Sequence, residues 1–97
     1  MKVKSYISET ISSVTDTCFS IPGDYNLPLL DSINKTKVQH IHCTNELNMA
    51  YTADGYARTT DFAVFVTTFS VGGLSAINGV AGSYAENCPV LHISCGP

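Results

Sequence analysis

Short apolar runs alternate with helical segments along the whole chain. Four runs have the length and residue content of buried strands: 18–21, 38–43, 62–67 and 90–94. Apolar or small residues at helical spacing predict helices before and between them: 3–14, 26–33, 46–56 and 71–85. A helical crossover is the connection that parallel strands require, so the alternation predicts an α/β domain with right-handed crossovers.

We therefore expect a flavodoxin-like, three-layer fragment in which a parallel sheet carries helices on both faces. The charged fraction of 13% is low, which suggests that part of the surface does not face water. Five Lys and Arg residues and a net charge of −3 provide no basic patch for nucleic acid or anionic lipid. No apolar run reaches membrane-spanning length, so nucleic acids and membranes are not expected partners.

Four cysteines lie in apolar, strand-like runs without C-x-x-C spacing: Cys18, Cys43, Cys88 and Cys95. We expect reduced, buried side chains rather than disulfides or metal ligands, and hence a reducing, cytoplasmic location. His40 and His42 lie on the same face of a predicted strand, a spacing that can bind zinc. No further ligand cluster accompanies them, so a structural histidine pair is the preferred interpretation.

The stretch TNELNMAYTADGYAR at residues 44–58 places Glu46 where an extended run passes into a helix. Thr44 or Asn45 can cap that helix, and a carboxylate in the first turn interacts favourably with the helix dipole. In open parallel sheets, ligands bind beyond the carboxyl ends of the strands, where such loops lie. Spacing alone leaves both interpretations of Glu46 open, a helix-terminal charge or a ligand-binding group.

The last predicted helix, residues 71–85, is rich in glycine, alanine and serine. An interior glycine costs a helix about 1 kcal/mol relative to alanine. We therefore expect a close neighbour against this helix, which could be the sheet, a cofactor or a second subunit. Gly79 and Gly82 loosely evoke a dinucleotide loop, but their position inside a late helix disfavours that function.

Four sequence blocks stand in order: IPGDYN (21–26), NELN to GYAR (45–58), TTFSVG (67–72) and NGVAGSYAE (78–86). Together they closely resemble the N-terminal, pyrimidine-binding domain of thiamine diphosphate-dependent 2-oxo acid decarboxylases, the pyruvate and indolepyruvate decarboxylases. The resemblance covers essentially the whole chain. Asp24 after Pro-Gly, and Ser-Val-Gly at 70–72 in place of Gly-Pro-Gly, are closer to the decarboxylases than to the acetolactate synthases, which remain an alternative.

The resemblance implies catalytic roles for Glu46 and Asp24. Glu46 matches the family glutamate that hydrogen-bonds the aminopyrimidine ring and promotes its imino tautomer, so that the cofactor can lose its C2 proton. Asp24 matches the family aspartate that assists proton transfers at the substrate, although an Asx turn after Pro-Gly is an alternative. Thr68, Val71 and Gly72 match the cofactor-binding loop beside the pyrimidine ring.

Family enzymes are several times longer than 97 residues. Their adjacent histidine pair, and the Gly-Asp-Gly…Asn motif that holds Mg²⁺ and the diphosphate, are missing here. We expect residues 1–97 to be the N-terminal portion of a pyrimidine-binding domain, with Mg²⁺ bound by a domain outside it. The parent enzyme is expected to convert a 2-oxo acid to an aldehyde and CO₂ as a homo-oligomer, a dimer or tetramer. A second hypothesis is an inert fragment that associates with a full-length homologue.

Overall fold

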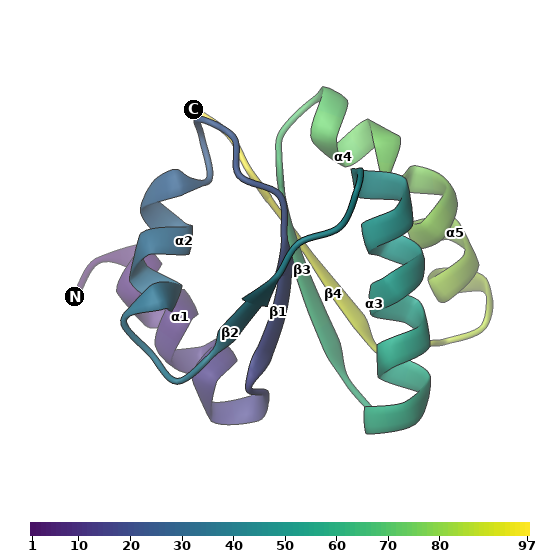
Figure 1. Cartoon of the computed structure of the whole chain (residues 1–97), viewed down its shortest axis with the longest axis horizontal. Coiled ribbons are helices and arrows are strands. Elements are labelled where there is room, and N and C mark those ends of the chain that lie inside the picture. Colours follow the sequence, from purple (N-terminus) through teal and green to yellow (C-terminus); the bar gives the residue numbers. More distant parts are fainter.

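The computed structural model describes residues 1–97 and shows a parallel sheet between two layers of helices (Figure 1). The strands are β1 (Thr17–Ser20), β2 (Gln39–Ile41), β3 (Ala63–Thr68) and β4 (Val90–Cys95). The helices are α1 (Val3–Val14), α2 (Leu27–Asn34), α3 (Glu46–Thr60), α4 (Val71–Ser75) and α5 (Ile77–Ala85). The strand order is β2-β1-β3-β4 and every neighbouring pair is parallel, which confirms the predicted α/β fold class.

Successive strand residues face opposite layers, because side chains alternate across a sheet. One buried cluster lies under α1 and α2 and consists mainly of branched aliphatic residues: Ile11, Cys18, Leu29, Leu30, Ile33, Val38, Val64 and Val66. The other lies under α3 and α5 and is dominated by alanine: Phe19, Met49, Ala50, Ala53, Ala57, Ala63, Phe65 and Ala76. The strands thus divide the core into two layers of different composition.

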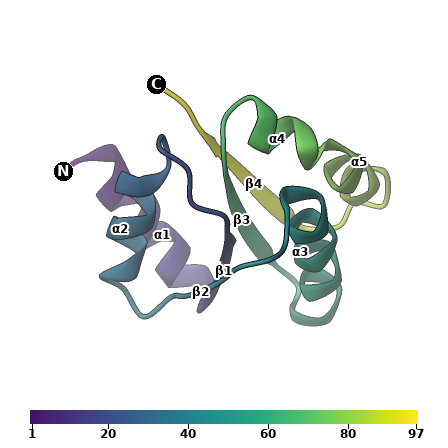
Figure 2. The same ribbon diagram turned by 45° about the horizontal axis from the view of Figure 1, so that its top comes forward.

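The carboxyl ends of the strands meet at one edge of the sheet. Figure 2 shows the loops that follow β1, β2 and β3 at this edge, together with the start of α3 and all of α4. The expectation that Glu46 begins a helix beyond a strand's carboxyl end is confirmed, since α3 starts at Glu46, shortly after β2 ends at Ile41. No helix of the chain has both the length and the apolar character that crossing a membrane would require.

The single helix predicted for residues 71–85 is wrong in one respect, because the structure divides it at Ala76 into α4 and α5. The Ala76 amide donates a hydrogen bond to the Gly73 carbonyl, three residues back. This 3₁₀-type bond ends α4 with a tighter turn than an α-helix has. The bend allows Gly72 to lie beside Thr68 while Gly79 lies against Ala50 of α3. The expected close neighbours of this glycine-rich segment are therefore the end of the sheet and another helix.

Two local expectations also need correction. The second strand is shorter than the predicted 38–43, because only Gln39–Ile41 pair with β1 at this edge of the sheet. All four cysteines are free, and Cys18 is fully buried as expected. Cys43 and Cys88, however, are half-buried residues in loops rather than in strands, and Cys95 is half-buried in β4.

Candidate functional site

Glu46 is the first residue of α3 and lies on a well-capped helix end. Asn45 has an extended backbone, and its side-chain oxygen accepts a hydrogen bond from the Asn48 amide at 2.9 Å. This confirms the expected cap and assigns it to Asn45 rather than Thr44. Glu46 is half-buried, and the two ion pairs of the chain both belong to Arg58, so the Glu46 carboxylate has no cationic partner.

Glu46, Thr68 and two glycine backbones lie close together beyond the sheet. A Cβ atom added to Gly72 would lie 3.4 Å from Glu46 Oε2 and 3.0 Å from Thr68 Cγ2. A Cβ atom added to Gly23 would lie 2.9 Å from the Cβ atom of Thr68. The segments that follow β1, β2 and β3 therefore meet near Thr68, and the absence of side chains at Gly23 and Gly72 allows this close approach.

The turn between β3 and α4 contains a strained residue. Ser70 has φ 61° and ψ −113°, a backbone conformation that residues other than glycine adopt at a cost of about 1–3 kcal/mol. Its carbonyl accepts the first helical hydrogen bond, from the Leu74 amide at 2.8 Å. This turn sends the chain into α4 so that Gly72 lies next to Glu46, while the Val71 side chain stays exposed.

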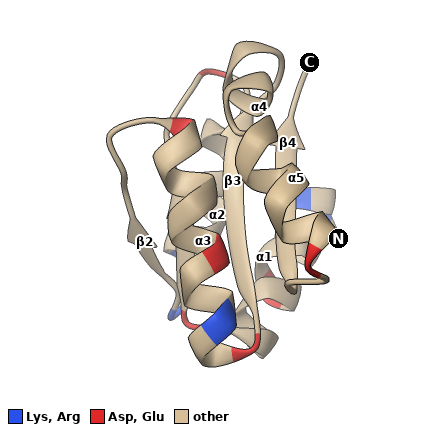
Figure 3. Cartoon of the chain, turned by 90° about the vertical axis from the view of Figure 1, so that its right-hand side faces the viewer, with Lys and Arg blue, Asp and Glu red and all other residues tan.

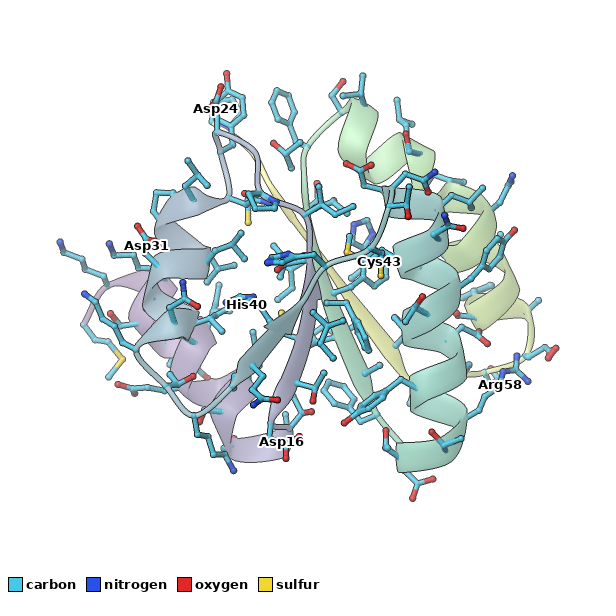
Figure 4. All side chains as sticks on the ribbon, in the orientation of Figure 1. Asp16, Asp24, Asp31, His40, Cys43 and Arg58 are labelled. Carbon is cyan, nitrogen blue, oxygen red and sulfur yellow. The ribbon has the colours of Figure 1, made fainter.

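Asp24 projects from the loop between β1 and α2, near the upper end of the molecule in Figure 4. It is exposed and forms no hydrogen bond within the chain, so it does not make the Asx turn that was its alternative role. The buried Asn26 holds this loop instead, because it accepts from the Gly23 amide at 2.8 Å and donates to the Ile21 carbonyl at 2.9 Å. Asn26 was missed from the sequence, although an asparagine at the start of the helix predicted for residues 26–33 was an available signal.

The segments that follow β1 and β3 also touch through aromatic rings. Tyr25 and Phe69 pack edge to face, with ring centroids 4.9 Å apart. A Cβ atom added to Gly96 would lie 3.5 Å from Phe69, so the residue after β4 lies against this ring pair. The structure therefore brings Glu46 and Thr68 next to Gly72, and it places Asp24 exposed on the β1–α2 loop and Val71 exposed at the start of α4.

A scan of protein-family models matches residues 1–97 to the family described as thiamine pyrophosphate enzyme, N-terminal TPP binding domain. The chain belongs to this family. Thiamine pyrophosphate is the thiamine diphosphate of the decarboxylases that the four sequence blocks resemble, so the family expected from the sequence is confirmed.

Known relatives in this family are pyruvate decarboxylases. A pyruvate decarboxylase of Aspergillus parasiticus is 54% identical over 78 residues, covering 80% of this chain and 14% of the relative. Pyruvate decarboxylase 4 of Arabidopsis thaliana is 53% identical over 87 residues, with 89% and 14% covered. Pyruvate decarboxylase isozyme 2 of Saccharomyces cerevisiae is 51% identical over 90 residues, with 91% and 16% covered. The chain thus spans only a small part of the length of these relatives.

The residues present fit the pyrimidine part of the family's cofactor. A flat ring requires bare backbone on which to lie and a hydrogen-bonding group at its edge, and the neighbouring residues Gly72 and Glu46 supply these. Nothing comparable exists for a metal ion, because no group of three or more His, Cys, Asp or Glu side chains comes together in the chain. The fit is therefore to one end of the cofactor.

The charged network of α3 lies at the opposite end of the helix from Glu46. Asp54 accepts hydrogen bonds from Arg58 and from the Ser83 hydroxyl, and Arg58 also binds Glu86 at 2.8 Å. The hydrogen bonds from Arg58 and then Ser83 hold the pKa of Asp54 below its usual value. This network connects α3 to α5 and has no contact with the candidate site.

Proposed function

We propose that residues 1–97 are the N-terminal portion of the pyrimidine-binding domain of a thiamine diphosphate-dependent decarboxylase. The whole enzyme would convert a 2-oxo acid of the pyruvate or indolepyruvate type to an aldehyde and CO₂. The observation that carries the proposal is the Glu46 carboxylate, half-buried without a cationic partner and next to Gly72. The activity of its pyruvate decarboxylase relatives supports pyruvate as the substrate type.

When bound, thiamine diphosphate supplies a nucleophilic carbon that adds to the substrate carbonyl and accepts the electron pair released with CO₂. Glu46 would share a proton with the ring nitrogen of the pyrimidine. Thr68, Val71 and Gly72 would lie along the ring and hold it against the carboxylate. Asp24, on the adjoining loop, would exchange protons with the substrate.

We propose further that Mg²⁺ and the diphosphate are held by a different domain of the whole protein, and that this protein is a cytoplasmic homo-oligomer. Figure 3 shows that α4 and α5 carry no charged residue. The exposed side chains on these two helices include four large apolar ones: Val71, Leu74, Ile77 and Tyr84. Such a surface supports burial against another subunit, and the four free thiols support a reducing compartment. The comparisons favour neither a synthase nor an inert fragment.

The decisive experiment replaces Glu46 in the whole enzyme. We expect Glu46→Gln to lower turnover by about 10²–10⁴-fold, because the amide cannot share the ring proton in the same way. The matched control is Glu9→Gln on α1, an exposed residue outside the site, which should leave turnover unchanged. Near-normal turnover of the Glu46 variant would reduce Glu46 to a helix-terminal charge and contradict the proposal.

Asp24→Asn separates the second proposed role from the first. We expect this variant to slow turnover while the cofactor still exchanges its C2 proton at a nearly normal rate, followed by NMR. Glu46→Gln should slow that exchange itself. Equal effects of the two substitutions on C2 exchange would contradict the division of roles between the two carboxylates.

The 97-residue chain by itself should bind thiamine diphosphate weakly and catalyse nothing. One charged hydrogen bond supplies about 1.5–3 kcal/mol, whereas association costs about 4–15 kcal/mol in lost translational and rotational freedom. Isothermal titration of the purified chain with cofactor and Mg²⁺ measures this directly. A dissociation constant in the low micromolar range would contradict the prediction and indicate a further binding site within these residues.

A further inference from the structure

A histidine side chain joins β1 to β2 beyond the point where their backbones stop pairing. The ladder between the two strands ends with Phe19 opposite Ile41. One residue further along, the Ser20 carbonyl accepts a hydrogen bond from His42 Nδ1 at 2.7 Å. Ser20 is also paired with Val66 of β3. The His42 imidazole therefore connects the end of β2 to the two central strands of the sheet, β1 and β3.

A second histidine fixes the Ser20 side chain. His40 Nδ1 lies 2.9 Å from Ser20 Oγ, and Ser20 is completely buried. The rings of His40 and His42 are parallel, with centroids 6.3 Å apart, and His40 lies on the side of β2 that faces α2 (Figure 4). Asp31 of α2 is exposed and lines the same surface pocket as His40 and His42.

The two imidazoles make different hydrogen bonds to Ser20. A carbonyl can only accept, so His42 must donate from Nδ1. Burial lowers the pKa of His40, although the Leu30 carbonyl acts in the opposite direction. The buried His40 Nε2 has no hydrogen-bond partner, so the Ser20 side chain is the group that holds this ring.

The hydrogen bond between His42 and Ser20, hereafter the link, lies shortly before both carboxylates of the candidate site in sequence. Ser20 precedes Asp24 by four residues, and His42 precedes Glu46 by four residues. Asn26 fixes the internal shape of the loop at residues 21–26, but its bonds stay within that loop. β2 has only three strand residues, so its own ladder gives little control over the segment that leads to Glu46.

We propose that His42 is a positioning residue that holds the Asp24 loop in register with the segment leading to Glu46, with His40 orienting Ser20 between them. This proposal rests on the proposed function of the two carboxylates. It also has consequences that can be measured without catalysis, in the 97-residue chain itself.

Hydrogen exchange at the Gly23 amide tests the link, because this amide is bonded to Asn26 Oδ1 and exchanges only when its loop opens. We expect His42→Ala to raise the exchange rate about fivefold, the effect of losing one typical hydrogen bond. His42→Asn places an amide N–H where Nδ1–H was and should restore the rate to within twofold. The Asp61 amide, bonded to the Ala57 carbonyl at the far end of α3, should be unaffected.

Two exchange results would overturn the proposal. An unchanged Gly23 rate in His42→Ala would show that the link does not hold the loop. An equal increase at Gly23 and Asp61 would show that His42 contributes only to global stability.

Nitrogen-15 NMR of the imidazoles gives an independent signature. With the rings neutral, His42 should be protonated on Nδ1, because the Ser20 carbonyl can only accept. An Nε2-protonated His42 would overturn the proposal, since it cannot donate to Ser20 in that form.

The whole enzyme supplies the catalytic readout. His42→Ala should lower kcat about fivefold with KM within twofold of wild type, and His42→Asn should restore kcat. Equal losses in both variants would overturn the positioning role. If Glu46→Gln kept normal turnover, the proposed function would fail while the exchange and tautomer results could still establish the link between the loops.

Discussion

The two faces of the sheet achieve close packing in opposite ways. Under α1 and α2, branched side chains such as Ile33, Val64 and Val66 fill the space between helix and sheet. Under α3 and α5, small residues let backbones approach, and a Cβ atom added to Gly79 would clash with that of Ala50. The first face depends on the volume of its side chains, and the second depends on the proximity of its helix backbones. The second face also carries Glu46 and Gly72, so a tightly fixed backbone lies behind the candidate site.

The largest expected effect tests the face that depends on volume. Ile33 is fully buried in the α1–α2 cluster, and Ile33→Ala should lower the free energy of unfolding by about 2–5 kcal/mol because it leaves a cavity. Leu27→Ala on the same helix is the control, since Leu27 is 43% exposed and should cost far less. Urea unfolding measures both. A loss below about 1 kcal/mol for Ile33→Ala, within the range of a surface change, would mean that this face can collapse around the gap.

The face that depends on proximity should instead resist added volume. Gly79→Ala should lower the free energy of unfolding by about 1–3 kcal/mol, because the new methyl group meets Ala50 of α3. Gly82→Ala lies in the same helix and meets nothing within 4 Å, so better helix propensity should stabilise the protein by up to about 1 kcal/mol. Thermal unfolding of both variants decides the matter. Stabilisation by both would show that α3 and α5 can separate at little cost.

The sequence predicted the architecture because the chain repeats one local signal. Each strand is a short apolar run and each helix has its own spacing of apolar or small residues, so the parallel sheet follows from local pattern. The start of α3 at Glu46 was equally local, because the Asn45 cap and the following helix are neighbours in sequence. That Glu46 and Gly72 belong to one site was expected only through the family resemblance.

Features that depend on distant contacts could not be predicted. The division at Ala76 accompanies the packing of Gly79 against Ala50, which is far away in sequence. The early end of β2 and the bond from His42 to the Ser20 carbonyl depend on where two strands stop pairing. Local periodicity carries no information on either, and the preferred interpretation of the histidines as a structural pair did not identify their partner.

The network between α3 and α5 predicts a smaller, pH-dependent effect. The folded protein holds the pKa of Asp54 below its ordinary value of 3.8, so its contribution to stability is present above that value and disappears as the pH falls through the lowered pKa. Asp54→Asn should therefore cost about 0.5–1 kcal/mol near pH 7, a modest amount because Arg58 is half-exposed. Unfolding measured between pH 7 and pH 2 should show the two proteins converging in acid. A constant difference would assign the effect to packing.

The smallest effect is expected where α3 ends. Asp61 has φ 70°, a left-handed conformation that glycine adopts more readily, so Asp61→Gly should raise the free energy of unfolding by about 0.5 kcal/mol. Thr60→Gly, one residue earlier and still helical, should instead destabilise the protein. Thermal unfolding distinguishes the two signs. Destabilisation by both would show that the carboxylate of Asp61 matters more than its backbone.

The strand order β2-β1-β3-β4 has a consequence for where any ligand of this fold can bind. From β1 the chain proceeds outward to β2, and it then returns to the other side of β1 to form β3. The helix after β1 covers one face of the sheet and the helices after β3 cover the other, so the chain leaves these two strand ends toward opposite faces, which is the place where open α/β sheets bind ligands. Gly23 follows β1 and Thr68 ends β3, and they lie against each other at this topological switch point. The position of the candidate site is therefore a product of connectivity, and substitutions of its side chains can change what it binds without moving it.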